Sequence, residues 1–207
     1  MIAIVDYRAG NLTSVQLALA ALGAPAGLAV SAEDVLRAER VVFPGVGAAG
    51  AAMRNLEERG LVVALRAVVA RGTPFLGICL GMQILFERSE EDGGTVTLGV
   101  LRGRVARFEP GPSGDKVPHM GWNQVRFRRA HPVFAGIEDE SEFYFVHSYY
   151  ALPAVPDDVL ATTAYAGVTF ASVVARANLV ATQFHPEKSG RLGLRVLENF
   201  CRWDGTC

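Results

Sequence analysis

A cysteine stands between two glycines in the stretch PFLGICLGMQ, residues 74–83, where an apolar run gives way to a segment that predicts a helix over 82–87. The pattern Gly77-x-Cys79-x-Gly81 matches the G-x-S-x-G nucleophile elbow, with sulfur in place of oxygen. Such a turn from strand to helix is so sharp that only glycine fits beside the nucleophile. It places the thiol at the C-terminal edge of a sheet and at a helix N-terminus, which favours the thiolate. The stretch predicts either a catalytic nucleophile or a buried structural cysteine.

A base for this nucleophile is present in ATQFHPEKS, residues 181–189. His185 ends an apolar strand-like run, and Pro186 restrains it to extended backbone. Because residues i and i+2 of an extended chain point the same way, we predict Glu187 on the same side as His185. A carboxylate there can hold the imidazole tautomer while the other ring nitrogen faces Cys79. Alone, the stretch is also typical of a strand-end histidine beside a solvated Glu–Lys pair; with the elbow it favours a Cys79–His185–Glu187 triad.

Acyl chemistry on a thiolate also needs donors for the developing oxyanion. One is the backbone N–H of Leu80, the residue after the nucleophile. The other is expected in FPGVG, residues 43–47, from the N–H of Val46, because glycines on both sides let that peptide rotate. A phosphate-binding loop is the weaker alternative, since neither a P-loop nor a dinucleotide-binding fingerprint is present. A tight turn without a ligand is the third reading.

Two further stretches carry unusual side chains. In KVPHMGWNQV, residues 116–125, Met120 and Trp122 lie in a polar loop, which predicts either an interface or a loop folded over a satellite core. In FVHSYYA, residues 145–151, a single strand would point His147 and Tyr149 one way and the residues between and after them the other way. That strand would line a pocket or be an ordinary half-exposed strand.

Composition narrows the class of protein. The chain has 207 residues, half of them hydrophobic, and a formal net charge of −1, which excludes a broad attraction to nucleic acid or anionic membranes. It has no apolar run long enough for a membrane span and no basic N-terminal region, so we expect a cytoplasmic protein without a signal peptide. The histidines are dispersed, and we expect no metal and no cofactor. A disulfide framework is not expected from three cysteines, Cys79, Cys201 and Cys207.

The order of elements predicts one three-layer α/β domain over residues 1–207, with a largely parallel sheet, helices on both faces and an antiparallel extension. In the first half, apolar strands alternate with amphipathic helices, as in a parallel sheet covered on both faces: strands at 2–7, 27–30, 40–45 and 74–79, and helices at 11–23, 33–38 and 61–72. Ser31 and Asp34 form a weak capping box. After Glu90, strand-like runs follow one another without long helices, which is typical of antiparallel sheet: 100–108, 122–127, 143–152, 159–166, 169–176 and 179–185, before a last helix at 190–203.

Together, GICLGMQ (77–83) and FHPE (184–187) resemble the class I (triad) glutamine amidotransferases. DYRAGNLTSV (6–15), PGVGA (44–48) and KVPHMGWN with FVHSYY look like the glutaminase subunits of imidazole glycerol phosphate synthases in particular. The resemblance runs from residue 2 to the last helix. One departure is Arg8, where the family pattern DYGxGN has glycine, and it bears on the geometry of the first loop.

The resemblance implies a glutaminase that hydrolyses glutamine to glutamate and ammonia. Cys79 would attack the amide, His185 would move the proton and Glu187 would orient His185. Ammonia would pass to a partner cyclase, a (β/α)₈ barrel in a heterodimer, which makes imidazole glycerol phosphate and aminoimidazole carboxamide ribotide in histidine biosynthesis. Substrate-binding positions carried over by motif are Gly47, Gln83, Ser148 and Tyr149; partner-facing positions are Asn11, Pro118, Met120, Trp122 and Lys188.

Two rival readings stay open at this point. A glutaminase of pyridoxal phosphate or anthranilate synthesis is disfavoured by the VPHMGWN stretch and by the absence of fused synthase sequence. A non-catalytic binding module or a redox sensor that reuses the elbow is disfavoured by the intact His185-Pro-Glu187, because a sensor needs only a reactive thiol.

Overall fold

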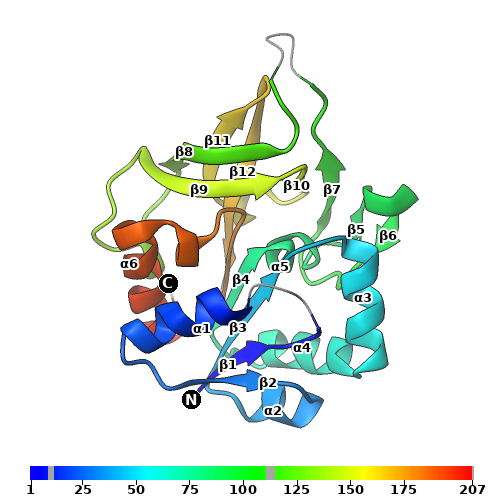
Figure 1. The fold of residues 1–207 in the computed structure, drawn as a ribbon, viewed down its shortest axis with the longest axis vertical. Helices are drawn as coiled ribbons and strands as arrows, with labels where there is room; N and C mark the ends of the chain where they lie inside the picture. Colours follow the sequence, from blue (N-terminus) through cyan, green and yellow to red (C-terminus); the bar gives the residue numbers. More distant parts are fainter. Residues whose placement is uncertain (9–11, 111–114, 207) are drawn as a thin grey trace.

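The computed structural model describes residues 1–8, 12–110 and 115–206 (Figure 1). Its strands are β1 (Ile2–Val5), β2 (Ala26–Ala29), β3 (Arg40–Gly45), β4 (Phe75–Cys79), β5 (Arg88–Ser89), β6 (Thr95–Val96), β7 (Gly103–Arg107), β8 (His119–Phe127), β9 (Ser141–His147), β10 (Tyr149–Pro153), β11 (Val159–Tyr165), β12 (Val168–Arg176) and β13 (Leu179–Thr182). Its helices are α1 (Leu12–Ala21), α2 (Ala32–Arg37), α3 (Ala49–Glu58), α4 (Leu61–Ala70), α5 (Leu80–Gln83) and α6 (Gly190–Arg202). Four 3₁₀ turns are η1 (Glu91–Gly93), η2 (Pro132–Phe134), η3 (Pro156–Asp158) and η4 (Pro186–Lys188).

The strands join in one sheet with the path β2-β1-β3-β4-β13-β12-β10-β7-β5-β6. The first five pair in parallel, and successive side chains of β1 and β3 point into different buried clusters. One cluster contains side chains of α2, α3 and α4, and the other contains those of α1 and α6. The parallel half is therefore a three-layer structure, because each face of the sheet buries its apolar side chains under helices.

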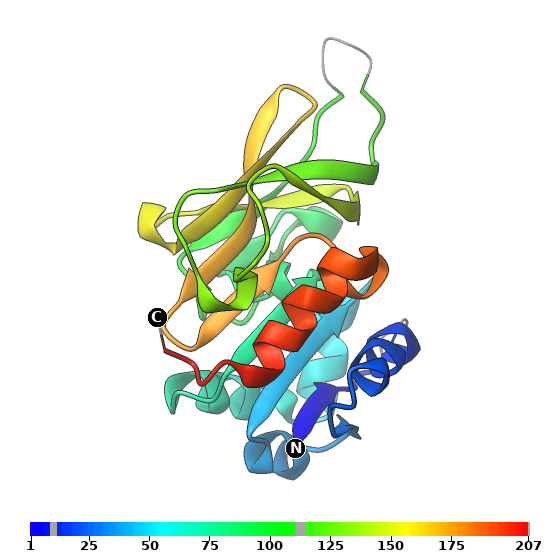
Figure 2. The ribbon, with the colours of Figure 1, turned by 90° about the vertical axis from the view of Figure 1, so that its left-hand side faces the viewer.

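The antiparallel part begins at β12, which pairs antiparallel with β13, β10 and β11. β11 continues to β8 and β8 to β9, so this extension rises beyond the helical layers (Figures 1 and 2). The predicted fold class is confirmed. The capping box is also present, because Ser31 accepts from the amide of Asp34 and the Asp34 carboxylate accepts from the amide of Ser31.

The helix predicted over 82–87 is wrong, and the helix α3 was not predicted. After the single turn of α5 the chain bends, because the carbonyl oxygens of residues 84–87 accept hydrogen bonds from the backbone amides of residues 97–101. A helix would give those carbonyls to residues four positions further on. The returning segment 97–101 takes them instead, which no local pattern announces.

Two other expectations need correction. The run 143–152 is not one strand: β9 ends at His147, β10 begins at Tyr149, and Ser148 lies at the break. The stretch that includes Met120 is not a loop, because β8 begins at His119 and pairs with β9 from its first residue. Arg8 has φ 66, a left-handed conformation that glycine adopts without strain, which explains why a glycine suits this position.

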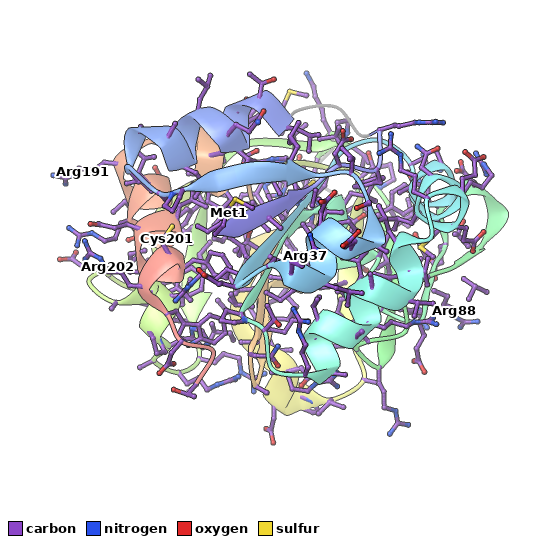
Figure 3. The ribbon with its side chains drawn as sticks, turned by 90° about the horizontal axis from the view of Figure 1, so that it is seen from below. Met1, Arg37, Arg88, Arg191, Cys201 and Arg202 are labelled. Carbon is purple, nitrogen blue, oxygen red and sulfur yellow. The ribbon has the colours of Figure 1, made fainter. Side chains whose placement is uncertain are left out.

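Two facts bear on location and on the remaining cysteines. Among the described residues, no helix is long and apolar enough to cross a membrane. Cys201 lies on α6 near Met1, and both line a small cleft (Figure 3). Burial is the main cause that raises the pKa of the Cys201 thiol, so this cysteine is a poor nucleophile. Cys207 lies outside the described residues.

Candidate active site

The nucleophile candidate occupies a strained turn. Cys79 closes β4 and precedes α5 with φ 55 and ψ −111, a conformation that side chains with a Cβ rarely adopt. A Cβ added to Gly81 would overlap the carbonyl oxygen of Phe43, and one added to Gly77 would lie 3.0 Å from the Cβ of Ala181. Both glycines are therefore required by the close approach of the elbow to β3 and β13.

His185 follows β13, the strand that pairs with β4 and so brings the imidazole to the elbow. Its Nδ1 lies 2.7 Å from Oε1 of Glu187, and both side chains are buried. The contact is the predicted one, but its cause differs: Pro186 opens the turn η4 instead of continuing an extended chain. Nε2 of His185 is buried, makes no hydrogen bond of ordinary geometry to the described residues, and shares a pocket with Cys79.

The charge state of His185 follows from burial and from two neighbours, Cys79 and Glu187. Burial favours the neutral imidazole, but the negative charge on Cys79 and the contacts with Cys79 and Glu187 outweigh burial and raise the pKa of His185 to about 10. Because Nε2 lacks a short hydrogen bond at rest, Cys79 acts on it chiefly through charge. The raised pKa favours the imidazolium form of His185, from which the ring can donate a proton.

The pocket around these groups measures about 420 Å³. It brings together the predicted catalytic pair, oxyanion donors and substrate-binding positions, with Glu187 behind His185. The lining residues are Val46, Gly47, Cys79, Leu80, Gln83, Glu91, Val146, His147, Ser148, Tyr149 and His185. Glu91 was not predicted from the sequence, whereas Val146 and His147 belong to the stretch 145–151, for which a pocket lining was one of two alternatives.

Glu91 brings a carboxylate into the pocket from η1. Its Oε2 accepts the backbone N–H of Ala49, at the start of α3, at 2.6 Å. Burial raises the pKa of Glu91, although the amide of Ala49 opposes that rise. No local sequence signal marks Glu91, because the loop that holds it reaches the pocket only through the returning segment after the elbow.

Gln183 is a second residue that sequence reasoning missed. Its Nε2 donates towards Sγ of Cys79 at 3.7 Å, and its Oε1 accepts from Nε2 of Gln83 at 3.0 Å. Nε2 of Gln83 also donates to the carbonyl oxygen of Tyr149 at 2.7 Å. Gln183 lies two residues before His185, but β13 ends at Thr182, so the alternation of an extended strand does not by itself place its side chain.

Two further histidines, His147 and His119, contact each other beside the pocket. The carbonyl of Tyr149 can only accept, so Nδ1 of His147 carries the hydrogen in their 2.8 Å contact. Nε2 of His147 then accepts from Nδ1 of His119 at 2.9 Å, and Nε2 of His119 accepts from Asn123 at 3.1 Å. Both rings are neutral, since burial lowers the pKa of His119 to about 4 and that of His147 to about 3.

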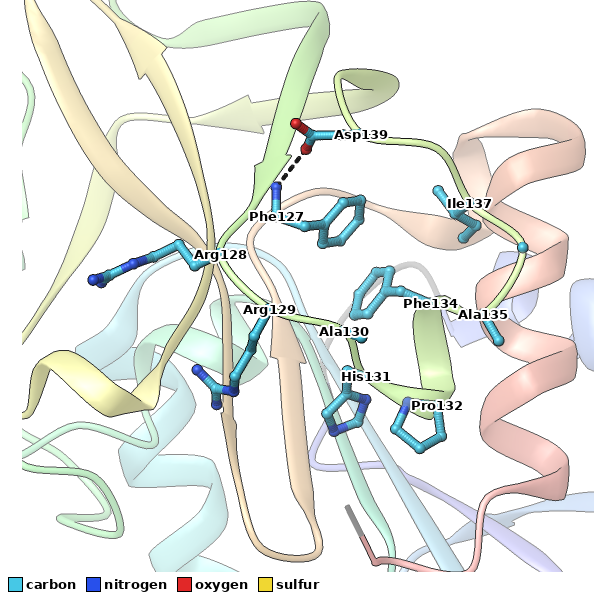
Figure 4. A pocket seen from close by; sticks show the side chains of 11 residues that line it. Phe127, Arg128, Arg129, Ala130, His131, Pro132, Phe134, Ala135, Ile137 and Asp139 are labelled. Atoms are coloured by element: carbon cyan, nitrogen blue, oxygen red, sulfur yellow. Dashed lines mark hydrogen bonds between the residues drawn. The ribbon is translucent and has the colours of Figure 1, made fainter.

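A larger hollow of about 780 Å³ lies away from the elbow, around η2 (Figure 4). Phe127 and Phe134 give it an apolar wall, and Asp139 is bonded to the amide of Phe127 at 2.7 Å. Arg128 donates to a backbone carbonyl of η3 at 3.3 Å. No nucleophile lines this hollow, so its volume carries no assignment of chemistry.

The predicted partner-facing residues are exposed where they are described. Met120 is 63% and Trp122 is 53% exposed on β8, and Pro118 and Lys188 are also at the surface. The ring of Trp122 packs edge-on against Tyr144 with centroids 6.1 Å apart. The carbonyl of Tyr144 accepts the backbone N–H of His185 at 3.0 Å, so this surface adjoins the candidate active site. Asn11 lies outside the described residues.

Residues 4–203 match the model of the family described as glutamine amidotransferase class-I. The chain belongs to the class-I glutamine amidotransferases. The resemblance predicted from the elbow and from FHPE is thereby confirmed, and the chain is an enzyme of the glutaminase type. Among the described residues, no group of three or more His, Cys, Asp or Glu side chains could hold a metal ion.

Two curated relatives narrow the family. A protein of Dehalococcoides mccartyi is 52% identical over 200 residues, 97% of this chain and 96% of the relative. A protein of Moorella thermoacetica is 53% identical over 199 residues, 96% of this chain and 93% of the relative. Both bear the name imidazole glycerol phosphate synthase subunit HisH, so this amidotransferase is of the HisH type.

Solved structures with low sequence identity support the fold alone. A crystal structure of a glutamine amidotransferase aligns over 100% of both chains with a TM-score of 0.74 at 20% identity. The structure of PurLQS from Thermotoga maritima covers 97% of each chain with a TM-score of 0.73 at 17% identity.

Proposed function

We propose that residues 1–207 act as one glutamine amidotransferase domain, the glutaminase subunit of a cytoplasmic imidazole glycerol phosphate synthase. The observation that carries the proposal is the strained Cys79 in one pocket with the buried imidazole of His185, which is backed by Glu187, among polar groups suited to an amino acid. The HisH-type relatives supply the pathway, histidine biosynthesis.

The thiolate of Cys79 attacks the side-chain amide carbon of glutamine, and its electron pair forms the C–S bond. The carbonyl oxygen becomes an oxyanion, which the N–H groups of Leu80 and Val46 stabilise. His185 donates its Nε2 proton to the nitrogen, the C–N bond breaks and ammonia leaves. Water then attacks the thioester while His185 takes its proton, and glutamate leaves as the thiolate reforms. Glu187 holds the imidazole orientation in both halves.

The polar lining suits glutamine. Gln83 has both N–H groups committed to Tyr149 and Gln183, so its oxygen is left to accept from the substrate. The carboxylate of Glu91 is the anionic group of the pocket lining and would bind the α-ammonium group. Gly47, Ser148 and Tyr149 also line the pocket and complete the predicted substrate contacts.

The partner is a cyclase of (β/α)₈-barrel form, bound as a heterodimer, which receives the ammonia. The exposed Met120 and Trp122 support this, because large apolar side chains exposed to solvent on a strand favour an interface. The free subunit should hydrolyse glutamine slowly, since an oxyanion donor aimed away costs about 10²–10³ in turnover. Partner contacts and nucleotide in the barrel would turn the N–H of Val46 inward. A free subunit as fast as the liganded complex would remove the need for this switch.

The decisive experiment compares two cysteine variants in the complex with the cyclase. Cys79→Ala should abolish glutamine-dependent synthesis and leave synthesis from high ammonium salt intact, because only the first half-reaction uses the thiol. Cys201→Ala is the matched control and should keep both activities. Failure of ammonium to restore turnover in the Cys79→Ala complex would show that the proposed division of labour is wrong.

A further inference from the structure

The hydroxyl of Tyr7 is a buried polar group that the proposed mechanism does not use. Tyr7 is 1% exposed, and its Oη has no hydrogen-bond partner among the described residues. A buried hydroxyl without a partner is less stable than the phenyl ring of phenylalanine at the same place. Such a group calls for a reason, and a partner available only in another state of the site is one.

The position of Oη supplies that reason. The ring packs against Phe43 of β3 with centroids 5.5 Å apart. A Cβ built on Gly45 would lie 2.5 Å from Oη of Tyr7 and 2.9 Å from the amide nitrogen of Gly81. The hydroxyl therefore lies where the end of β3 meets the elbow, beside the peptide that joins Gly45 to Val46.

Tyr7 and the nucleophile pack in buried clusters on different faces of the sheet, and Tyr7 is not among the residues that line the pocket. Tyr7 belongs to the buried cluster with α3 and α4, whereas Cys79 belongs to the other cluster and lines the pocket. Burial, together with the charge on Cys79, raises the pKa of Tyr7 above its ordinary value. The hydroxyl is thus protonated at neutral pH and available as a donor.

We propose that Tyr7 is a positioning residue whose hydroxyl donates a hydrogen bond to the carbonyl oxygen of Gly45 when the N–H of Val46 turns into the pocket. In a trans peptide the C=O and N–H point in opposite directions, so turning the N–H towards the oxyanion swings the C=O to the opposite side. Oη of Tyr7 lies next to Gly45 on the face of the sheet away from the Cys79 cluster, without a partner among the described residues. The bond stabilises the competent oxyanion hole over the resting state. This inference rests on the proposed function, because it deepens the assignment of Val46.

The test is Tyr7→Phe in the complex with the cyclase and its nucleotide substrate. Removal of one neutral hydrogen bond made only in the competent state should lower kcat for glutamine hydrolysis by about 3- to 10-fold. KM for glutamine and ammonia-dependent synthesis should not change. The Tm of the free subunit should not fall, because the hydroxyl makes no hydrogen bond to the described residues. The NMR signal of the Val46 amide in the liganded complex should shift towards its free-subunit position.

A matched control is Tyr165→Phe, which removes a phenol hydroxyl that donates to the carbonyl of Lys116 at 2.6 Å, outside the pocket. It should lower Tm slightly and leave kcat for glutamine unchanged. An unchanged kcat in Tyr7→Phe would overturn the inference while loss of activity in Cys79→Ala keeps the proposed function. A fall in Tm with parallel loss of ammonia-dependent synthesis would also overturn it, because that pattern marks a structural role.

Discussion

Two buried histidines border the same pocket and are driven towards opposite charge states: His185, which contacts Glu187, and His147, which contacts His119. Burial favours the neutral ring at both His185 and His147. At His185 the charge of Cys79 and the carboxylate of Glu187 outweigh burial, and its pKa rises to about 10. At His147 the neighbours are a carbonyl and the neutral His119, so burial prevails and its pKa falls to about 3. The groups in contact with each ring, and not the degree of burial, therefore decide in which direction its pKa shifts.

The difference separates a proton donor from a structural connection. His185 keeps Nδ1 on Glu187, while its Nε2 makes no hydrogen bond of ordinary geometry to the described residues and shares the pocket with the nucleophile. His147 has both nitrogens bonded, one to Tyr149 and one to His119. A ring with no spare nitrogen cannot serve as a general acid. It can fix the carbonyl of Tyr149, on which the amide of Gln83 also depends.

The largest loss of activity is expected from His185→Ala. It removes the acid that protonates ammonia and the acceptor for the proton of water, so kcat for glutamine hydrolysis should fall by about 10²–10⁴. Glutaminase assays of the complex measure this, and ammonia-dependent synthesis serves as the control. A loss below tenfold in a folded variant would remove His185 from the proton transfers.

Glu187→Gln should have a smaller effect than His185→Ala. The carboxylate orients and stabilises the imidazolium, while the imidazole itself moves the proton. Loss of the negative charge should also lower the pKa of His185, which Glu187 helps to raise. The pH profile of kcat/KM measures this shift. Equal losses of kcat in the two variants, both folded, would argue against separate roles.

The two pairs should give the free energy of unfolding opposite pH dependences. His147 and His119 have folded pKa values of about 3 and about 4, below the ordinary 6.5, so their contribution is present above pH 6.5 and lost as pH falls through those values. His185 has a folded pKa of about 10, so its contribution is present below pH 6.5 and lost as pH rises through about 10.

His147→Gln tests this assignment. In urea unfolding across the pH range, the free energy of unfolding should fall less steeply at acid pH than in the parent chain. Its dependence at alkaline pH should not change, because His185 is still present. His185→Ala should show the reverse pattern. If the free energy of unfolding of His147→Gln fell as steeply at acid pH as that of the parent chain, His147 and His119 would not be the source of the acid loss of stability.

The sequence predicted the parts of the site that depend on local chain geometry. The glycines at Gly77 and Gly81 follow from sterics over a few residues. The contact of His185 with Glu187 was also predicted, but it forms through the turn η4 and not through an extended chain. The helix over 82–87 and the carboxylate of Glu91 could not be predicted in the same way. Both depend on residues 97–101, which return and take the carbonyls after the elbow. Competition for hydrogen bonds between distant segments leaves no local periodicity.

The smallest effect on the chemistry is expected from Trp122→Ala, although its effect on assembly should be large. Trp122 stands 53% exposed on β8, opposite Tyr144 of β9. The carbonyl oxygen of Tyr144 accepts the backbone N–H of His185, and β9 ends at His147, so the surface around Trp122 adjoins both His185 and His147.

Truncation of a central aromatic residue weakens an interface by roughly 2 kcal/mol or more. The dissociation constant for the cyclase should therefore rise by more than about tenfold, while glutamine hydrolysis at saturating cyclase stays close to the parent rate and the free subunit stays folded. Calorimetric titration with the cyclase and the ratio of glutamine used to product formed measure the two terms. Unchanged affinity and unchanged coupling would place Trp122 outside the interface, and a changed pH profile at saturation would show that the surface acts on His185 directly.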